Sequence, residues 1–375
     1  MRSFYKIRTL LSAVAVAGLV PAAAAAQETD DNTAFGTTSA EFLLLGAGAR
    51  GAALGGSFAA LADDPSALYH NPAGIALARG PGVSLSTYDY IVDTRYSWGG
   101  VVFPFAGGAR AFGVQLGTFG FSDQPVYTVE QPDGTGSVYS VNETFVGLTY
   151  AQNFSDRFSA GLTAKMVIDQ LGEANGSAFA VDFGTNFHAM LNNHPIKFSF
   201  VLANLGTNLS YTGDALNVDI PREPLPGEGE TPTVPIEGQL RTKDFSLPTI
   251  FRVGLAYDLF TGEDSRLTLL GDFNQPTSAK AGFVFGGEWA AQRLGGSGFG
   301  AALRGSYTYQ ASNKAEDVIA GINTDLADDE NLQGLGLGGG INYAAANGFL
   351  LGVDYAYRHM GVFGGTSFFT FNVGW

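Results

Sequence analysis

The strongest constraint on the fold is a two-residue alternation of side-chain types that begins near residue 82 and continues to the C-terminus. In residues 251–259, large apolar side chains occupy every second position, and small or polar ones fill the positions between them. The same pattern recurs in segments 265–275, 279–290, 297–310 and 348–358. This period belongs to β-strands, because successive side chains of a strand point to opposite faces of the sheet. The sequence therefore predicts an all-β protein.

The composition decides between two kinds of β-protein. A soluble β-sandwich also alternates, but its wet face is usually rich in Lys and Glu, and an ordinary soluble domain carries about 25% charged residues. This chain has only 15% charged residues, whereas 52 Gly, 29 Phe and 15 Tyr supply small and aromatic positions. Such strands suit a transmembrane barrel with a polar, narrow or plugged lumen. Closure also satisfies every backbone N–H and C=O group within the bilayer.

The alternating segments predict about fourteen antiparallel strands, an even number as in bacterial barrels. They span residues 82–91, 94–104, 109–120, 138–151, 157–170, 177–190, 196–205, 247–260, 265–275, 279–290, 297–310, 333–345, 348–358 and 366–375. The long connections all follow odd-numbered strands: 121–137, 206–246 and 311–332. Outer-membrane barrels carry long loops outside the cell and short turns in the periplasm. We therefore predict a bacterial outer-membrane β-barrel over residues 81–375, with outer-membrane lipid around it.

The first 26 residues have the features of a cleaved secretory signal peptide. Arg2, Lys6 and Arg8 form a cationic start, residues 9–20 are apolar, and the alanine run at 22–26 offers a cleavage site. About twelve apolar residues are too few to cross a hydrocarbon core of ~30 Å. We therefore expect export of the chain and removal of residues 1–26.

The last strand ends on an aromatic residue and carries a large apolar side chain at every second position. These are Phe369, Phe371, Val373 and Trp375. An aromatic C-terminal strand of this form resembles the signal that outer-membrane proteins present to the barrel-assembly machinery. We therefore expect that machinery to be a partner during biogenesis.

Residues 27–80 do not alternate and differ from the predicted barrel. Their glycines permit tight turns and close backbone packing. Asp64 before Pro65 and Asn71 before Pro72 are typical starts of short helices, with a capping side chain followed by proline. The segment is too small and too apolar for a free periplasmic domain. We predict that it folds into the lumen as a hatch.

Seven charged residues lie on the polar faces of the later strands and are expected to point into the lumen. They are Arg252, Asp258, Asp272, Glu288, Arg304, Asp354 and Arg358. On adjacent strands they could form a charge ladder that holds the hatch, with Arg50, Asp63 and Asp64 as its hatch partners. The alternatives are ordinary filling of the lumen with paired charges and, less favoured, a role in binding substrate.

The hatch segment resembles a known family signature. The matching elements are Gly48-Ala49-Arg50, Leu54-Gly55-Gly56, Ala62-Asp63-Asp64, Ala67-Leu68-Tyr69 and Asn71-Pro72-Ala73-Gly74. They resemble the N-terminal signature of the PorV/PorQ proteins, a branch of the FadL-like outer-membrane barrels. The residues we single out as the hatch motif are Gly48, Arg50, Gly55, Gly56, Asp63, Asp64, Asn71, Pro72 and Gly74.

The resemblance implies a fourteen-stranded barrel with an N-terminal hatch, and one of two functions. PorV-type proteins act in type IX secretion, so our leading prediction is a docking or transport component of envelope protein secretion, with secretion-system proteins as partners. FadL-type proteins pass hydrophobic molecules, so the alternative is a transporter of hydrophobic small molecules across the outer membrane.

No motif predicts catalysis, a metal or a cofactor. The histidines, His70, His188, His194 and His359, form no His-Glu-x-x-His pattern, there is no Gly-x-Ser-x-Gly elbow, and Cys is absent. The cluster Asp325, Asp328, Asp329 and Glu330 is best interpreted as a solvated acidic loop. A net charge of −15 without a basic cluster argues against nucleic acid as a partner. We therefore predict that the protein is not an enzyme.

Overall fold

The computed structural model describes residues 36–56, 58–220, 235–310, 334–360 and 364–375. They belong to one compact unit, residues 34–375. The following lie outside the described residues: the expected signal peptide, residues 27–35 and 57 of the expected hatch, residues 221–234 of the long connection expected at 206–246, and the acidic cluster at 325–330.

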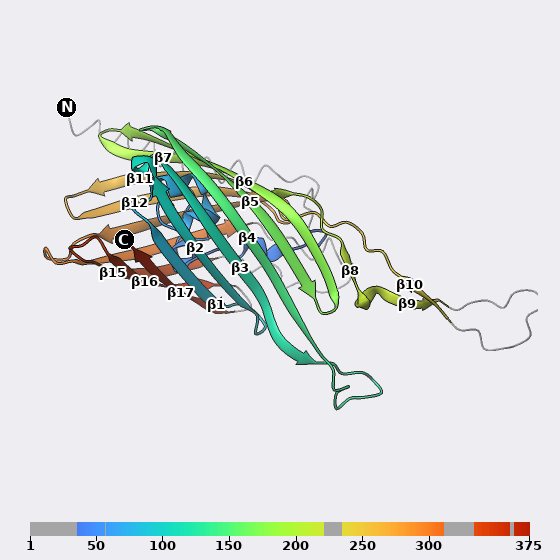
Figure 1. Ribbon diagram of the computed structural model, residues 1–375. Helices are drawn as coiled ribbons and strands as arrows, with labels where there is room; N and C mark the ends of the chain where they lie inside the picture. Colours follow the sequence, from blue (N-terminus) through green and yellow to red (C-terminus); the bar gives the residue numbers. More distant parts are fainter. Residues whose placement is uncertain (1–35, 57, 221–234, 311–333, 361–363) are drawn as a thin grey trace, which may run out of the picture. The chain divides into compact units, whose positions relative to one another are not determined.

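Fourteen of the described strands form a closed antiparallel barrel (Figure 1). They are β1 Gly82–Asp89, β2 Arg95–Phe105, β3 Arg110–Pro125, β4 Val138–Ser155, β5 Phe158–Leu171, β6 Ala174–Leu191, β7 His194–Gly206, β11 Ile250–Thr261, β12 Ser265–Pro276, β13 Gly282–Ala291, β14 Phe299–Gln310, β15 Leu335–Ala344, β16 Leu350–His359 and β17 Gly365–Gly374. Each pairs with its sequence neighbours, and β1 pairs with β17. The predicted fold is confirmed.

Three shorter strands belong to the long connection between β7 and β11. They are β8 Tyr211–Gly213, β9 Asn217–Ile220 and β10 Ile236–Gln239, with the 3-10 turn η4 Asp214–Leu216 after β8. Strand β8 continues the sheet beside β6, whereas β9 and β10 form a separate two-stranded ribbon. The alternation did not predict them, because they are too short to show a period.

The alternating apolar side chains form a lipid-facing belt on the outside of the barrel. Leu255 is 40% exposed, Leu303 64% and Phe371 58%. Each such side chain is worth about 1.5–3 kcal/mol when it is removed from water, so the belt needs lipid around it. No helix among the described residues is long and apolar enough to span a membrane.

The two ends of the barrel differ in their connections. At one end, called here the turn end, the connections are short, such as η3 Ala106–Gly108 and the pair Asn192–Asn193, whose φ angles of 52° and 65° suit a tight hairpin. The opposite end, called here the loop end, carries the long β3–β4 and β7–β11 connections (Figure 1). By the usual orientation of such barrels, the turn end faces the periplasm.

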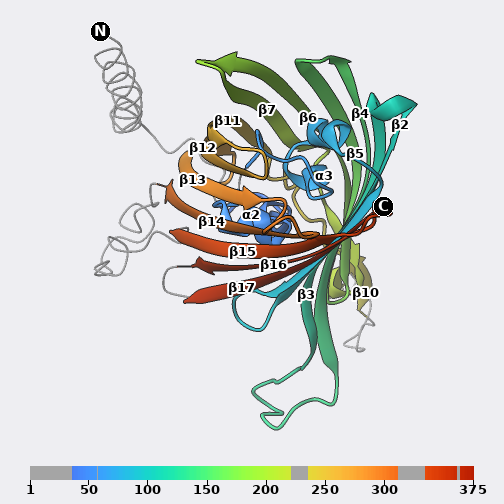
Figure 2. The same ribbon diagram turned by 90° about the vertical axis from the view of Figure 1, so that its left-hand side faces the viewer.

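The hatch lies inside the barrel (Figure 2). It consists of η1 Glu41–Leu44, α2 Ala49–Ala53, α3 Ala67–His70 and η2 Pro72–Leu77. Its large apolar side chains, among them Phe42, Leu54, Leu68 and Ile75, are almost fully buried. The backbone enters beside the β7–β11 connection, where Ser39 N donates to Ser246 O at 3.0 Å, and leaves at the turn end into β1. The hatch therefore runs along the lumen from one end toward the other.

Two capping side chains set the short hatch helices. Asp64 Oδ1 accepts from Ser66 N at 2.8 Å, so it closes a turn and α3 begins only at Ala67, two residues later than the Asp-Pro pattern predicts. Asn71 Oδ1 accepts from Ala73 N at 3.1 Å and caps η2, as predicted, although η2 is a 3-10 helix. The capping chemistry fixes where each turn starts but not the type of helix that follows.

Candidate functional site

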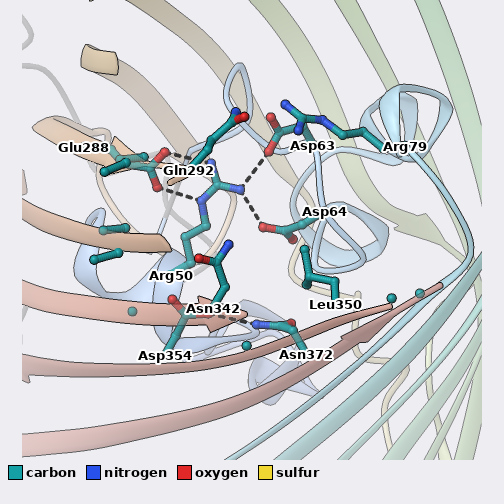
Figure 3. Close-up of a pocket in the computed structure, with 18 of the residues that line it drawn as sticks. Arg50, Asp63, Asp64, Arg79, Glu288, Gln292, Asn342, Leu350, Asp354 and Asn372 are labelled. Carbon is teal, nitrogen blue, oxygen red and sulfur yellow. Dashed lines mark hydrogen bonds and ion pairs between the residues drawn. The ribbon is translucent and has the colours of Figure 1, made fainter. Parts of the chain in front are cut away.

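Arg50 connects the hatch to the barrel wall. Its Nε and Nη2 donate to the two carboxylate oxygens of Glu288 on β13, at 2.9 and 3.0 Å. Its Nη1 donates to Asp63 at 2.8 Å and to Asp64 at 2.5 Å, both in the hatch segment between α2 and α3. Figure 3 shows the guanidinium between these three carboxylates. Paired bonds between a guanidinium and a carboxylate are among the stronger protein hydrogen bonds, because both groups are charged.

Glu288 is shared by three arginines. Besides Arg50, it accepts from Arg304 Nε on β14 at 2.8 Å and from Arg266 Nη2 on β12 at 3.1 Å. The antiparallel register positions these groups, since Glu288 stands directly opposite Arg304. The Glu288 side chain is only 1% exposed. A buried charge of this kind is tolerated because the surrounding cations satisfy it, and removing one of them is costly.

The network continues along the wall toward the last strand. Arg304 Nη1 donates to Asp354 Oδ1 on β16 at 2.5 Å. Asn372 Nδ2 on β17 donates to Asp354 Oδ2 at 2.8 Å (Figure 3). Gly340 on β15 leaves space between them, because a β-carbon there would lie 2.0 Å from Asp354 Oδ1. The charges on β13, β14 and β16 are thus joined to the hatch through Arg50.

The hatch side of the network stays charged at neutral pH. Burial raises the pKa of Asp63, but the attraction of Arg50 and Arg266 outweighs it and holds the pKa below its ordinary value. The side chains of Asp63 and Asp64 are 30% exposed and line a cavity at the turn end. They therefore bind Arg50 and face open space together.

The other four predicted lumen charges lie apart from this network. Asp272 accepts from the hatch backbone at Ala59 N, 3.1 Å away, and Asp258 accepts from a threonine hydroxyl at 2.6 Å. Arg252 and Arg358 are buried, 4% and 8% exposed. The single ladder that the strand phases suggest is therefore divided. Asp258 lines the same cavity as the network without binding its arginines, whereas Arg252, Asp272 and Arg358 do not line that cavity.

Asn71 and Pro72 place the hatch against β5 and β6. The Asn71 Nδ2 donates to Asn186 Oδ1 on β6 at 3.0 Å and to Ala59 O in the hatch at 2.9 Å. The wall has a glycine at this contact, Gly184, and this leaves room for the hatch, since a β-carbon there would lie 2.2 Å from Asn71 Oδ1. The hatch motif thus includes a polar contact with the wall and depends on a wall glycine.

The predicted hatch glycines serve turns and close packing. Gly48, Gly55 and Gly56 have φ angles of 83°, 81° and 78°, which side chains rarely adopt. Gly74 has ordinary backbone angles, but a β-carbon there would lie 2.2 Å from the carbonyl oxygen of Ala62. All four therefore sit where a larger residue would strain the hatch.

Two features of the lumen escaped prediction. Arg266 joins the Glu288 network, but a charged residue next to the β11–β12 turn gave no reason to place it there. On the opposite wall, Lys165 Nζ lies 2.7 Å from Asp182 Oδ2 and 2.7 Å from Asn204 Oδ1. Lys165 and Asp182 both fall on the small or polar positions of the two-residue alternation, which face the lumen. This shared position in the alternation is the sequence signal that could have predicted their pairing.

An aromatic cluster occupies the lumen toward the loop end. The Phe42 ring of η1 lies 6.4 Å from Phe119 on β3 and 6.0 Å from Phe145 on β4, centroid to centroid. Tyr90, in the β1–β2 connection, lies 6.1 Å from Phe119. Phe42 and Phe145 are buried, whereas Phe119 and Tyr90 are only partly buried. The hatch therefore packs its Phe42 ring into an aromatic cluster of the wall, and Phe119 and Tyr90 form the partly exposed edge of that cluster.

A cavity of about 820 Å³ lies at the turn end of the barrel, and residues of the Arg50 network form part of its lining (Figure 3). The β11–β12 turn, the C-terminal Trp375 and the junction between hatch and β1 line its rim. The hatch thus separates two different surroundings, aromatic toward the loop end and charged toward the turn end.

Three residues of the expected assembly signal, Phe369, Phe371 and Val373, lie in β17, and Trp375 directly follows the strand. Phe369 is 47% exposed, Phe371 58% and Trp375 53%, on the lipid-facing side, and Val373 is partly buried. Their geometry suits a terminal strand read from outside, and their role in assembly stays a prediction.

The histidines do not come together. His70 is buried and its Nε2 lies 2.7 Å from Ala47 O in the hatch. His188 lines a second cavity of about 330 Å³ with Ser159, near the turn end. His194 begins β7 and His359 ends β16. Within the described ranges, no three His, Asp or Glu side chains are grouped so as to hold a metal ion.

Solved structures share this architecture. The Ralstonia pickettii toluene transporter TbuX is 12% identical, with 88% of this chain and 98% of that chain covered and a TM-score of 0.51. The Pseudomonas putida toluene transporter TodX is 13% identical, covers 88% and 96%, and has a TM-score of 0.51. A Pseudomonas aeruginosa FadL homologue is 9% identical, covers 87% and 97%, and has a TM-score of 0.46.

The chain shares the closed-barrel fold of the toluene transporters TbuX and TodX. The shared fold and the lipid-facing belt agree with the predicted place in the bacterial outer membrane. These similar structures are transporters. No protein-family model matches the chain, and no curated protein matches it in sequence. The PorV/PorQ branch therefore rests on the sequence resemblance alone.

Proposed function

We propose that the protein is a conduit for small hydrophobic molecules across the outer membrane, and that the hatch is its gate. The observation that carries this proposal is the aromatic cluster of Phe42, Phe119, Phe145 and Tyr90 on the outer side of the hatch. Apolar ring faces favour an apolar molecule over a sugar or an ion, because they offer no hydrogen-bond partners.

The shared fold supports the same function. TbuX and TodX are toluene transporters of this architecture. A monoaromatic hydrocarbon is therefore the first class of molecule to test. Because the hatch runs through the lumen, a molecule that reaches the aromatic cluster can pass further only if the hatch moves. This proposal takes up the alternative that the sequence left open, in place of a secretion role.

A second candidate function is the docking of secreted proteins, in the manner of PorV-type proteins. The hatch signature at residues 48–74 favours it, as does the loop end, where the β3–β4 hairpin and the β9–β10 ribbon extend beyond the shorter strands (Figure 1). In that case the hatch is a permanent seal.

Native mass spectrometry of the protein, gently extracted from its own outer membrane, separates the two. We expect a bound apolar small molecule and no stoichiometric protein partner. A stoichiometric protein partner with an empty lumen would favour docking and would contradict the conduit.

A further inference from the structure

The second cavity, of about 330 Å³, lies at the turn end, where the hatch and the wall meet. Leu77, the last residue of η2, lines it together with glycines of the β2–β3 turn. Ser159 on β5 and His188 on β6 line it from the wall. The β4–β5 turn contributes Arg157, which is exposed. The cavity therefore combines buried wall positions with a turn that faces the periplasm.

Two of the lining side chains have polar atoms that the described residues leave unpaired. Ser159 is 2% exposed and shares the inward side of β5 with the buried Thr163, and its Oγ has no hydrogen-bond partner among the residues that the structure describes. The Nε2 of His188 is buried and equally lacks a partner in the described ranges. Such an atom is costly, because it has lost its bond to water and gained none in exchange. A ligand in the cavity that accepts hydrogen bonds would satisfy both.

The charges around the cavity balance, so net charge does not choose the ligand. Arg157 forms no ion pair with a described residue, and its neighbour Asp156, also exposed, is the one carboxylate in the described lining. Lys197 stands opposite His188 on β7, and the hatch carboxylate Asp63 acts on His188 with the opposite sign. Recognition then rests on the donors. A guanidinium only donates, and a hydroxyl and an imidazole N–H can donate beside it, which fits a ligand with several acceptor oxygens, such as a phosphate.

Two aromatic rings line the same cavity on its lipid-facing side. Phe154 is 63% exposed and Phe158 39%, and their ring centroids are 5.9 Å apart. Phe158 shares the outward side of β5 with Leu162, which is 52% exposed. Aromatic residues near the ends of barrel strands are typical of the membrane interface, where the headgroups of a leaflet lie. An apolar chain can therefore lie against these rings while its phosphate reaches the cavity.

We propose that this cavity binds a phosphate group, and that a phospholipid of the periplasmic leaflet, not free phosphate, supplies it. Arg157, Ser159 and His188 donate to the phosphate oxygens. Phe154 and Phe158 contact the start of the acyl chain outside the barrel. A volume of about 330 Å³ takes a headgroup but not the acyl chains, which stay in the bilayer. The site does not depend on passage of an apolar molecule through the lumen.

The test uses the full mature protein in a maltoside detergent, washed free of its own lipid, and native mass spectrometry. The probe is palmitoyl lysophosphatidylglycerol, and the control is monopalmitoylglycerol, which has the same chain and a glycerol but no phosphate. We expect one saturable site for the probe and about tenfold weaker binding of the control. Equal affinities would overturn the phosphate site. Inorganic phosphate that binds as tightly as the probe would overturn the phospholipid as its source.

Single variants locate the site. Arg157→Gln should weaken binding of the probe about tenfold, because it removes the charged donor. Ser159→Ala should weaken it severalfold, although it breaks no hydrogen bond to a described residue and should melt no lower than the wild type. The matched control is Arg293→Gln, which removes an exposed arginine of the β13–β14 turn that does not line the cavity. An equal loss in the control would mean attraction by overall charge, and wild-type binding in Ser159→Ala would contradict a site in this cavity.

Discussion

Arg50 in the hatch and Glu288 in the wall are joined by two parallel hydrogen bonds of 2.9 and 3.0 Å. Around them, Arg266 and Arg304 bind the same wall carboxylate, while Asp63 and Asp64 bind the same hatch guanidinium. The pair is therefore the point at which the charges of the hatch and the charges of the barrel become one network.

Arg50→Ala should loosen the hatch without unfolding the barrel. Glu288 keeps two arginines, so we expect a loss of roughly 2 kcal/mol, below the 3–5 kcal/mol typical of a buried pair that loses its sole partner. Hydrogen exchange of hatch amides should quicken about 30-fold, measured by mass spectrometry. Arg95→Ala is the control, since its pair with Asp89 is 68% and 73% exposed, and it should change nothing. Unchanged hydrogen exchange in Arg50→Ala would contradict the conclusion that Arg50 holds the hatch to the wall.

Arg304→Ala should raise leakage of small solutes. Arg304 separates two carboxylates, Glu288 and Asp354, and without it they repel each other beside the hatch. Conductance in planar bilayers should rise severalfold over the wild type. Arg304→Lys keeps the charge but cannot bridge both acceptors with the same fork, so it should fall in between. If Arg304→Ala had the conductance of the wild type, Arg304 would have no role in sealing the lumen.

Gly184→Ala should displace the Asn71–Pro72 turn. Its β-carbon would lie 2.2 Å from Asn71 Oδ1, so the hatch must shift, at a cost of about 1–3 kcal/mol. Faster exchange around η2 is the expected signature. Gly271→Ala is a fair comparison, because nothing lies closer than 3.8 Å to its β-carbon, and it should behave as the wild type. Equally fast exchange around η2 in both variants would contradict a specific contact between Gly184 and the Asn71–Pro72 turn.

Acid should loosen the hatch around His70, which lies outside the membrane-spanning strands. Burial lowers the pKa of His70 to about 4. A released hatch would protonate this ring near its ordinary pKa of about 6.5, so protons favour release. The hatch is therefore held most strongly in the lumen above about pH 6.5, and this hold weakens as the pH falls toward 4. Hatch exchange, corrected for its chemical pH dependence, should follow that window, and His70→Gln should flatten it.

The sequence predicts the barrel well because strand phase and lipid exposure are both properties of single residues. Leu255 faces lipid and Arg252 faces the lumen, as their alternation requires. It predicts less of the site. The strand phases place Glu288 and Asp272 alike on the inward face, but only the stagger of the barrel decides that Glu288 meets Arg50 and that Asp272 meets a backbone amide. Arg266 was missed for the same reason.

The most direct test of the gate is a reversible cross-link between hatch and wall. A β-carbon at Gly48 would lie 3.8 Å from Thr370 Oγ1 on β17, and the chain has no other Cys to interfere. Gly48→Cys with Thr370→Cys should form a disulfide under oxidising conditions. Because Gly48 has a φ of 83°, Gly48→Cys alone is the control for backbone strain.

We expect proteoliposomes to take up toluene when the double variant is reduced and to lose that uptake when it is oxidised, while the single variant takes up toluene in both states. Uptake that the cross-link leaves unchanged would contradict the hatch as the gate, and no uptake above empty liposomes in the reduced protein would contradict the conduit itself.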